Sequence, residues 1–486
     1  MLTAEAAILK VQALYECLAT RRPEVEEFDR YYEGEHPLKY ASPEWAEFHK
    51  GRYKGFADNW TAVVADASNE RLQVTGVRAG SESGERELWA DWLRNDMPAQ
   101  SSQGFLESII AKRSAVIVWG NSDDEPVSTW EHPAQVYVEY AADNPRKRLY
   151  ALKAWVDGNR EFATLYEADA VWKFERQSPF VIEDGKTKSG LYVSGTAWGS
   201  GWEPRQASGD DTWPIANPLG EIPVVEVPNR PRLGREPLSD IAGTMAMQDA
   251  INLLWAYLFG AADHASFPAR VVMGNEHPKL PVLDKDGKKV GEKPVDLKDL
   301  QHGRLLWLTG QNASIGQWDA AKLDVFTDVI EVAIGHIGGQ TRTPAHYFVA
   351  NKGLSNINGE TLVATETPLV KKVEEFQLFS SRAMSDIFRL YAKVRGNEAL
   401  ADSLTTSSVQ WANPAIRSEA QMADSLLKKK QIGYPLEYLL ELDGLPGPDR
   451  ARILEMARRE QTDPFLAMAA MRGLDGDDSG SAVGGE

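Results

Sequence analysis

The spacing of apolar residues predicts helices at the start of the chain. Leu9, Ala13 and Cys17 recur at the i, i+4, i+8 spacing of one helix face, and Pro23 punctuates the pattern. Residues 59–72 also have a helical pattern. The first part of the chain is therefore expected to be helical.

The pattern then changes to one typical of strands. Between 114 and 228, short runs of β-branched and aromatic residues occur at 116–119, 136–140 and 151–156, separated by turn-forming stretches. Residues 183–213 are dense in Gly, Ser and Asp, which favours loops. This region is expected to be a mostly β module.

Three longer helices are predicted in the second half. The first begins near Pro237 and ends before Pro268. The second runs from Asp319, a suitable N-cap, to about Thr341. The third covers 359–396 and is expected to bend where Pro368 interrupts it, because proline cannot donate its backbone hydrogen bond.

A Lys-rich and Pro-rich segment, 275–304, separates the first two of these helices. Asp286-Gly287 predicts a hairpin turn within it, and short strands are predicted at 269–273 and 304–308. The segment is expected to form a small protruding module.

The C-terminal part is predicted to be helical after one possible strand. The predicted elements are a strand at 409–411, a helix over 418–433 that opens with capping-box spacing, and short helices at 435–443 and 448–460. The tail from Gly473 is rich in Gly, Ser and Asp and is expected to be disordered.

Composition excludes several classes of protein. The 486 residues allow about three domains. With 53 Lys and Arg against 71 Asp and Glu, the net charge of −18 argues against a free-standing basic DNA-binding protein. Cys17 is the only cysteine, so an intrachain disulfide is impossible and a reducing cytoplasm is expected. Mean hydropathy of −0.39 and short apolar runs indicate a soluble protein with no membrane partner.

The common motifs of enzymes are missing. Phe180 stands where a phosphate-binding loop ending in Gly185-Lys186-Thr187 would need its first glycine, and HExxH, GxSxG and GxGxxG do not occur. The eight histidines are scattered singly. No catalytic residue, cofactor or metal site is therefore predicted.

Two weaker alternatives concern calcium and carbohydrates. Asp475, Asp477, Ser479, Gly480 and Glu486 have the spacing of a calcium loop, but they lie in a tail expected to be a solubilising acidic segment. Fifteen tryptophans and many acids would suit a carbohydrate-active enzyme, yet the β segments cluster before the long helices instead of alternating with them.

Several segments occur in an order that is informative over almost the whole chain. They are Tyr31–Leu38, Asn59-Trp60, Glu70-Arg71-Leu72 with Gly76, Pro133–Tyr140, Asn217–Pro223, Asn229-Arg230, Gln248–Asn252, Thr341–Pro344, and Trp411 with Pro414 and Ser418. In this order they resemble the portal (head-to-tail connector) proteins of tailed bacteriophages.

The resemblance implies an α+β fold with the portal architecture and assembly as a ring, usually of twelve subunits. The implied segments are an α/β wing (1–235), stem helix 1 (236–267), a clip (268–318), stem helix 2 (319–342), a tunnel loop (343–358), a long wing helix (359–396), a wing return (397–417), a helical crown (418–472) and a disordered acidic tail (473–486).

The resemblance also implies a function in the virion. The ring would occupy the capsid portal vertex after assembly in the host cytoplasm, form the channel for DNA packaging and ejection, and have no catalytic residues of its own. The implied partners are further copies of the chain, double-stranded DNA, the large terminase, a head-completion adaptor, and the major capsid and scaffold proteins. The alternative is another virion ring or minor capsid protein, against which the two-helix stem with its clip argues.

Three groups of site residues follow from this assignment. The tunnel loop would contact DNA through His346, Tyr347, Phe348, Asn351 and Lys352, although Tyr347 and Phe348 would equally suit packing against neighbouring helices. The clip would bind partners through Lys285, Lys288, Lys289 and Lys293.

The second stem helix would present an acidic stripe to the channel. Asp324, Asp328 and Glu331 share one helix face. The opposite face carries Leu323, Phe326, Ile330, Ile334 and Ile337, which would pack against the first stem helix and the adjacent subunit. The simpler alternative is that the acids only face solvent near a helix N-terminus.

Overall fold

The computed structural model describes residues 1–35, 56–158, 160–177, 201–205, 212–266, 270–273, 279–283, 288–294, 305–308, 314–317, 322–348, 359–415, 419–445 and 447–462. The chain forms two compact units. The first comprises Met1–Glu33, Thr61–Gly243 and Thr341–Glu486, and the second Gly34–Trp60 and Thr244–Gln340. None of the helices in the described part of the chain combines the length and the apolar character that crossing a bilayer requires.

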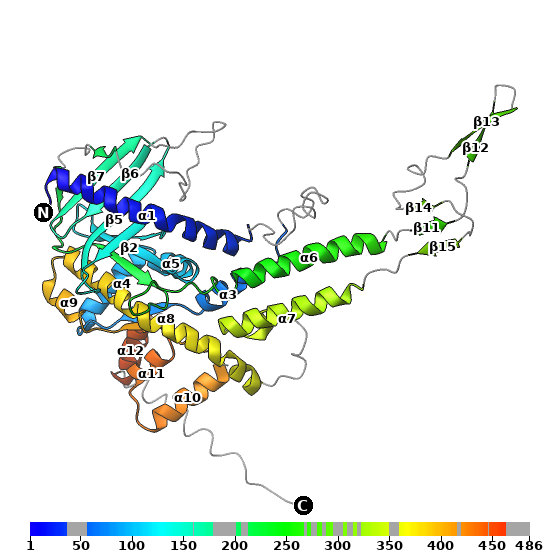
Figure 1. Ribbon diagram of the computed structural model, residues 1–486. Helices are drawn as coiled ribbons and strands as arrows, with labels where there is room; N and C mark the ends of the chain where they lie inside the picture. The colour runs from blue at the N-terminus through cyan, green and yellow to red at the C-terminus, as the bar shows by residue number, and fades with distance from the viewer. Residues whose placement is uncertain are drawn as a thin grey trace, which may run out of the picture. The chain divides into compact units, whose positions relative to one another are not determined.

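The first unit contains a six-stranded antiparallel sheet, and the N-terminal helix α1 (Ala4–Glu33) lies across it (Figure 1). The strands are β4 (Val136–Tyr140), β5 (Arg148–Asp157), β6 (Arg160–Tyr166), β7 (Ala170–Gln177), β8 (Glu203–Pro204) and β9 (Ile215–Ala216). They follow the order β4-β5-β6-β7-β8, with β9 paired to β7. One hydrophobic cluster joins α1 to the sheet and includes Ala7, Val11, Leu14, Leu18, Leu152, Leu165 and Trp172.

Helix α1 confirms the predicted helix, but the residues whose spacing predicted it do not lie on its buried face. Leu9 is 66% exposed and Cys17 is exposed, so the stripe that predicted the helix is its outer face. Pro23 lies inside α1 and does not end it. The helix continues past Pro23 because Leu18 before it and Phe28 after it are both buried in the same unit.

A second, three-stranded sheet has the order β10-β2-β3. Its strands are β2 (Arg113–Gly120), β3 (Pro126–Glu131) and β10 (Val224–Pro228), all antiparallel, with Val224 opposite Ile117. The predicted β-rich region is therefore confirmed. Helices α4 (Glu82–Arg94) and α5 (Met97–Ala111) precede it and were not predicted. Ser81, whose side chain caps α4 by accepting from the Gly84 amide, was the available signal.

The close approach of α5 to strand β3 requires a glycine. A Cβ atom at Gly104 would lie 1.8 Å from Nε1 of Trp130, which donates to Ser114 Oγ at 2.7 Å. Gly104→Ala is therefore expected to destabilise the protein by about 1–3 kcal/mol, because Trp130 must move. Urea unfolding followed by tryptophan fluorescence tests this, with Gly243→Ala as the control because a Cβ there meets open space. Equal losses in the two variants would contradict the argument.

Helix α8 (Gly359–Val394) crosses the first unit and confirms the predicted long helix, with Pro368 inside it. Its buried side chains include Leu369, Val373, Phe376, Ile387, Phe388 and Tyr391. Helix α9 (Glu398–Ser403) follows, and strand β16 (Val409–Trp411) then pairs with β1 (Val74–Val77). Helix α3 (Trp60–Asn69) confirms the helical prediction before β1.

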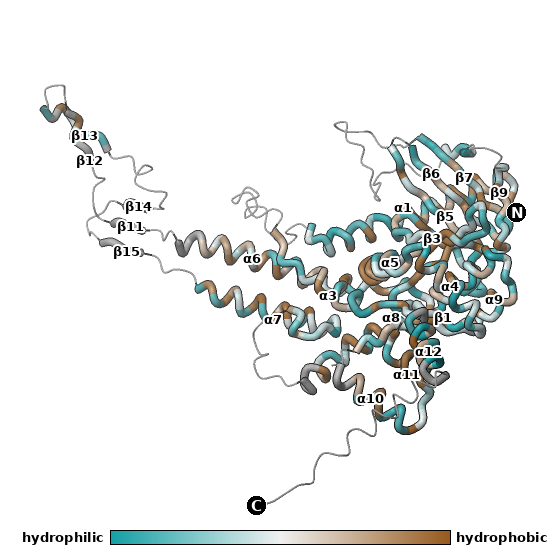
Figure 2. The backbone as a smooth tube through the Cα atoms, turned by 180° about the vertical axis from the view of Figure 1, so that it is seen from behind, coloured by the Kyte–Doolittle hydropathy of each residue, from teal (hydrophilic) through white to brown (hydrophobic). Residues whose placement is uncertain are grey.

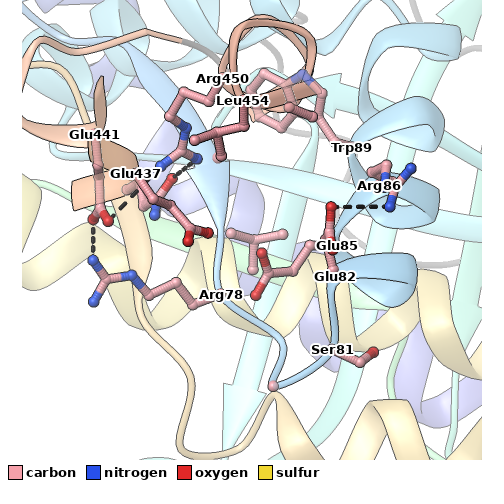
Figure 3. A pocket seen from close by; sticks show the side chains of 15 residues that line it. Arg78, Ser81, Glu82, Glu85, Arg86, Trp89, Glu437, Glu441, Arg450 and Leu454 are labelled. Carbon is pink, nitrogen blue, oxygen red and sulfur yellow. Dashed lines mark hydrogen bonds and ion pairs between the residues drawn. The ribbon is translucent and has the colours of Figure 1, made fainter. Parts of the chain in front are cut away.

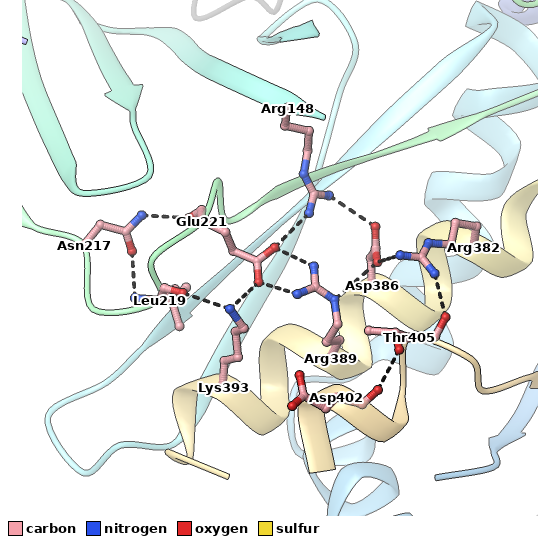
Figure 4. Close-up of polar contacts among 10 residues, drawn as sticks. All are labelled: Arg148, Asn217, Leu219, Glu221, Arg382, Asp386, Arg389, Lys393, Asp402 and Thr405. Carbon is pink, nitrogen blue, oxygen red and sulfur yellow. Dashed lines mark hydrogen bonds and ion pairs between the residues drawn. The ribbon is translucent and has the colours of Figure 1, made fainter. Parts of the chain in front are cut away.

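A network of ion pairs joins α8 to the segment before β10 (Figure 4). Arg389 donates to both carboxylate oxygens of Glu221, and Lys393 lies 2.8 Å from the same carboxylate. Burial alone would raise the pKa of Glu221, but Arg389 and Lys393 hold it below its usual value. The charged form of Glu221 therefore stabilises the junction of α8 with the β-rich module.

Three C-terminal helices pack onto the first unit, namely α10 (Glu419–Gln431), α11 (Leu436–Leu442) and α12 (Gly447–Thr462). They confirm the three predicted helices to within a few residues. A cavity of about 490 Å³ lies between α4, β16, α11 and α12 (Figure 3). Polar side chains pair across it: Arg78 forms an ion pair with Glu441, and Arg450 donates a hydrogen bond to Gln410 at 2.7 Å. These pairs attach the terminal helices to the rest of the unit.

The described residues of the second unit include two helices and several short strands. Helices α6 (Met245–Ser266) and α7 (Asp324–Thr341) run side by side in both views (Figures 1 and 2). The strands are β11 (Arg270–Met273), β12 (Lys279–Leu283), β13 (Lys289–Pro294), β14 (Leu305–Leu308) and β15 (Ser314–Gln317). Strand β11 lies between β14 and β15, and β12 pairs antiparallel with β13. The predicted strands at 269–273 and 304–308 are confirmed; the predicted turn at Asp286-Gly287 lies outside the described residues.

Both helices begin later than predicted. Helix α6 begins at Met245, not near Pro237, because the preceding residues form a turn in which the Ser239 hydroxyl accepts from the amides of Ile241 and Ala242. Helix α7 begins at Asp324, after two described residues that are not helical. Asp319, predicted as its N-cap, lies outside the described residues.

Candidate functional site

Three carboxylates lie on one exposed face of helix α7. Asp324, Asp328 and Glu331 are all exposed, as their i, i+4, i+7 spacing requires if one face of the helix points away from its packing partners. On the opposite side, Ile330, Ile334 and Ile337 are buried, with exposed fractions of 3%, 6% and 0%. The predicted acidic stripe and the predicted packing face are thus on different sides of the helix.

Helix α7 also has an exposed apolar face, which we call the valine stripe: Val325, Val329 and Val332. These side chains are 59%, 48% and 59% exposed and again follow i, i+4, i+7 spacing. A contiguous row of exposed apolar side chains on a soluble protein marks an interaction surface.

Helix α6 is apolar around most of its circumference. Residues 253–262 contain no charged side chain, and Leu254, Trp255 and Leu258 are only partly buried. A helix that is apolar all round is normally covered on every side. Both helices of the second unit therefore carry apolar surface beyond what a single copy of the unit buries.

Well-defined hydrogen bonds fix the start of α6 within the second unit. Gln248 accepts from the amide of Trp60 at 2.8 Å, and Asn252 accepts from the amide of Asp58 at 2.9 Å. Trp255 Nε1 donates to the Asp58 carboxylate at 2.7 Å. Two segments of the sequence pattern that are far apart in the chain, Asn59-Trp60 and Gln248–Asn252, are thus brought into direct contact.

The predicted loop residues that are described make contacts within the protein. Arg71 Nη2 donates to Tyr347 Oη at 2.6 Å and lies 2.6 Å from a carboxylate oxygen of Glu366. The other oxygen of Glu366 lies 2.6 Å from Nε2 of His346. Tyr347 also donates to Glu70. Burial and the bond to Glu70 raise the pKa of Tyr347 to about 12, so its hydroxyl stays protonated.

These contacts involve three of the five residues predicted to face DNA. Phe348 is only 6% exposed, and the contacts of Tyr347 and Phe348 are those of the packing alternative. His346, Tyr347 and Phe348 therefore anchor the beginning of the loop. Asn351 and Lys352, the remaining members of the set, lie outside the described residues. The pair of Arg71 and Glu366, which provides the anchor, was not predicted as part of any site.

The predicted clip lysines lie at the paired strands β12 and β13. Lys288 and Lys293 are exposed, and Lys289 is the first residue of β13, opposite Leu283. Lys285 lies outside the described residues. The described lysines thus lie along one hairpin.

A buried ion cluster in the first unit holds two of the four chain segments that connect to the second unit, those next to Thr244 and Gln340. Asp240 lies 2.8 Å from Lys372 and 2.6 Å from Arg230. Lys372 also donates to the backbone carbonyl of Thr341 at 3.2 Å. Because Asp240 precedes Thr244 and Thr341 follows Gln340, one lysine of α8 fixes the first unit at both ends of the segment 244–340. No pattern in the sequence predicted this cluster beyond the presence of its charged residues.

Two largely apolar helices with exposed faces carry a small strand module, which is an arrangement typical of a structural subunit. Comparison with known proteins identifies the class of protein. Residues 12–462 match the model of the phage portal protein family described as SPP1 Gp6-like. The chain is 24% identical over 388 residues to the portal protein of Mycobacterium phage D29. The aligned region covers 75% of this chain and 71% of the phage D29 protein. The chain is 23% identical over 383 residues to the portal protein of Mycobacterium phage L5, with the same coverage.

Because the family match spans most of the chain, the protein belongs to the SPP1 Gp6-like family of phage portal proteins. It is a structural component of the bacteriophage virion that acts at the capsid portal vertex, and it is not an enzyme. The mixed α+β structure with antiparallel sheets agrees with the portal fold that family membership implies. Membership also implies an oligomeric ring through which DNA passes. The assignment made from the sequence is thereby confirmed.

Proposed function

We propose that this chain forms the twelve-subunit portal ring, with α6 and α7 as the stem around the channel. The observation that carries the proposal is the division of α7 into an acidic face, a valine stripe and a buried face. A helix that lines a channel in a ring needs three such faces, one for the channel, one for the neighbouring subunit and one for its own subunit.

In this arrangement the acidic face of Asp324, Asp328 and Glu331 points into the channel. Repeated around the ring, these carboxylates repel the phosphates of DNA and keep the duplex away from the wall. The net charge of −18 has the same sign and adds to the effect. DNA then moves without a deep electrostatic minimum that would hold it in place.

The valine stripe in turn contacts the partly exposed apolar side of α6 in the next subunit. Such a contact joins two different surfaces, so it repeats head to tail and closes into a ring. It covers apolar surface on both helices. The stripe thus takes over the role of contacting the adjacent subunit, which the sequence pattern had assigned to the isoleucine face.

The remaining parts of the chain are assigned by their place around this stem. The clip, 268–318, binds terminase during packaging and then the head-completion adaptor through Lys285, Lys288, Lys289 and Lys293. The tunnel loop, anchored through Tyr347 and Arg71, presents Asn351 and Lys352 to DNA. The wing and the crown, 418–472, meet the major capsid and scaffold proteins.

Reversing the charge of the acidic face tests the proposal. In the triple variant Asp324→Lys, Asp328→Lys, Glu331→Lys, lysines attract passing phosphates, so packaging is expected to slow several-fold at low salt and to recover as salt screens the attraction. The measurement is the rate of DNA packaging into proheads at two salt concentrations. Ring integrity is checked by electron microscopy, which should show rings with a central hole.

A matched control changes the charge equally in the first unit. Asp123→Lys, Asp143→Lys, Asp402→Lys alters three exposed acids there. This variant should package at the wild-type rate at both salt concentrations. If intact rings of the α7 variant also package normally at low salt, the acidic face does not line the channel.

A further inference from the structure

Three side chains that can bind metal meet in the first unit, outside every surface assigned above. Asp29 comes from α1, Glu107 from α5, and His132 from the residue that follows β3. The atoms that these side chains offer as ligands all lie within 4.8 Å of one another. The side chains are only 16%, 31% and 11% exposed. The cluster is therefore more enclosed than an ordinary group of surface acids.

Both carboxylates approach the same nitrogen of the imidazole. Nε2 of His132 lies 3.3 Å from Oδ2 of Asp29 and 3.1 Å from Oε2 of Glu107. A single N–H group makes one well-directed hydrogen bond. Correspondingly, Oε2 of Glu107 is buried and has no hydrogen-bond partner among the described residues. The buried oxygen thus points to a group that the described residues do not supply.

On the other side of the ring, the amide of Ala134 donates to Nδ1 of His132 at 3.2 Å.

The distances from Nε2 of His132 to the two carboxylate oxygens also suit a metal ion. Ligands that lie about 2.0–2.2 Å from zinc in tetrahedral or octahedral geometry are about 3.0–3.4 Å apart. The two distances to Nε2 fall in this range. One imidazole with two carboxylates is a ligand set that borderline divalent ions such as Zn²⁺ accept, whereas Mg²⁺ and Ca²⁺ prefer oxygen ligands alone.

We propose that Asp29, Glu107 and His132 form a binding site for one Zn²⁺ ion, which joins α1, α5 and the residues after β3. The ion replaces the proton on Nε2, and the ring then carries its proton on Nδ1. The Ala134 amide gives up its contact with the ring, a single long hydrogen bond that the three ligand bonds outweigh. The site has a structural role within one subunit and does not depend on the assignment of the stem.

The test uses the full, untagged protein freed of metal by EDTA and dialysis. Titration calorimetry with Zn²⁺ is expected to show one ion bound per subunit, and Zn²⁺ should raise the melting temperature. Glu107→Gln keeps the size of the side chain and is expected to weaken binding at least about tenfold. Co²⁺ should give a visible absorption spectrum in the wild type that His132→Asn loses. Glu26→Gln, which removes a carboxylate near Asp29, is the matched control and should bind as the wild type does.

Each outcome decides the question. Wild-type protein that binds less than one Zn²⁺ per subunit, or melts at the same temperature with and without Zn²⁺, overturns the site without reference to any variant. Equal Zn²⁺ binding by the wild type and Glu107→Gln also overturns it. The cluster is then a histidine hydrogen-bonded between two acids. The wild-type measurements keep the test valid if a variant folds poorly.

Discussion

Replacing Val329 and Val332 by aspartate is expected to abolish ring assembly and leave a folded subunit. Both side chains are largely exposed in the single chain, at 48% and 59%, so the change costs the isolated subunit little. In the proposed ring the same positions are covered by the apolar side of α6 from the next subunit. Two unpaired carboxylates would then be buried at every contact, which costs several kcal/mol. Because about 1.4 kcal/mol changes an equilibrium tenfold, each contact should weaken at least about a hundredfold.

Light scattering after size exclusion measures this effect directly. Twelve copies of the 53.9 kDa chain give a ring of about 650 kDa, and the variant should elute near the mass of one subunit. The control, Val329→Thr with Val332→Thr, keeps the shape of both side chains without adding charge and should still form rings. If the aspartate variant forms rings in normal yield, the valine stripe does not lie between subunits.

The sequence predicted best those elements that are long and strongly periodic. Helix α8 was predicted at 359–396 and is observed at Gly359–Val394. The predicted strand at 136–140 coincides with β4. In both cases the local pattern and the tertiary packing favour the same structure, so the residues themselves contain most of the information.

Tertiary contacts decided the elements that the pattern did not predict. The residues after Pro237 had a helical pattern, yet Ser239 and Asp240 form a turn because the Asp240 carboxylate is buried against charges from α8 and from Arg230. Helix α1 was predicted from Leu9 and Cys17, which lie on its exposed face. A different and more continuous apolar face of the helix packs on the sheet. A periodic stripe identifies a helix without showing which face is buried.

The candidate site was predictable only where helix geometry fixes it. The spacing of Asp324, Asp328 and Glu331 was enough to place them on one face, and all three are exposed. The valine stripe was missed because exposure of an apolar residue depends on neighbours that the sequence does not reveal. For the loop, the aromatic residues suited DNA contact and packing equally, and Arg71, more than 200 residues earlier in the chain, contacts Tyr347. Contacts between residues so far apart in the sequence cannot be inferred from local spacing.

Removing the charge of Asp240 is expected to cost about 3–5 kcal/mol of folding stability, the usual effect of leaving a buried charge without its partner. Asp240 and Lys372 have side chains that are 3% and 4% exposed and lie 2.8 Å apart. In Asp240→Asn, the ammonium of Lys372 remains buried without its counter-charge. Urea unfolding followed by tryptophan fluorescence, at equal protein concentration, measures the loss. The control Asp424→Asn removes an exposed ion pair with Lys428, 58% and 71% exposed, and should cost less than about 0.5 kcal/mol.

The difference between wild type and Asp240→Asn should depend on pH. Burial alone would raise the pKa of Asp240, but Lys372 and Arg230 hold it below the ordinary value. A carboxylate with a lowered pKa in the folded protein stabilises it above the pKa of the unfolded chain, about 3.9, and loses this contribution as pH falls through the folded value. The two proteins should therefore differ most near pH 7 and converge below about pH 4. A difference that stays constant down to pH 3, or that does not exceed that of Asp424→Asn at pH 7, would contradict the role of the charge.

The same variant should loosen together the two connections at the ends of segment 244–340. Asp240 fixes Lys372, and Lys372 donates to the carbonyl of Thr341 at 3.2 Å. Hydrogen exchange in Asp240→Asn should therefore increase both at 239–243 and at 341–343, although these segments are about a hundred residues apart in the chain. In Asp424→Asn neither segment should change. An increase confined to 239–243 would mean that Lys372 holds Thr341 without help from Asp240, and that the two connections are anchored independently.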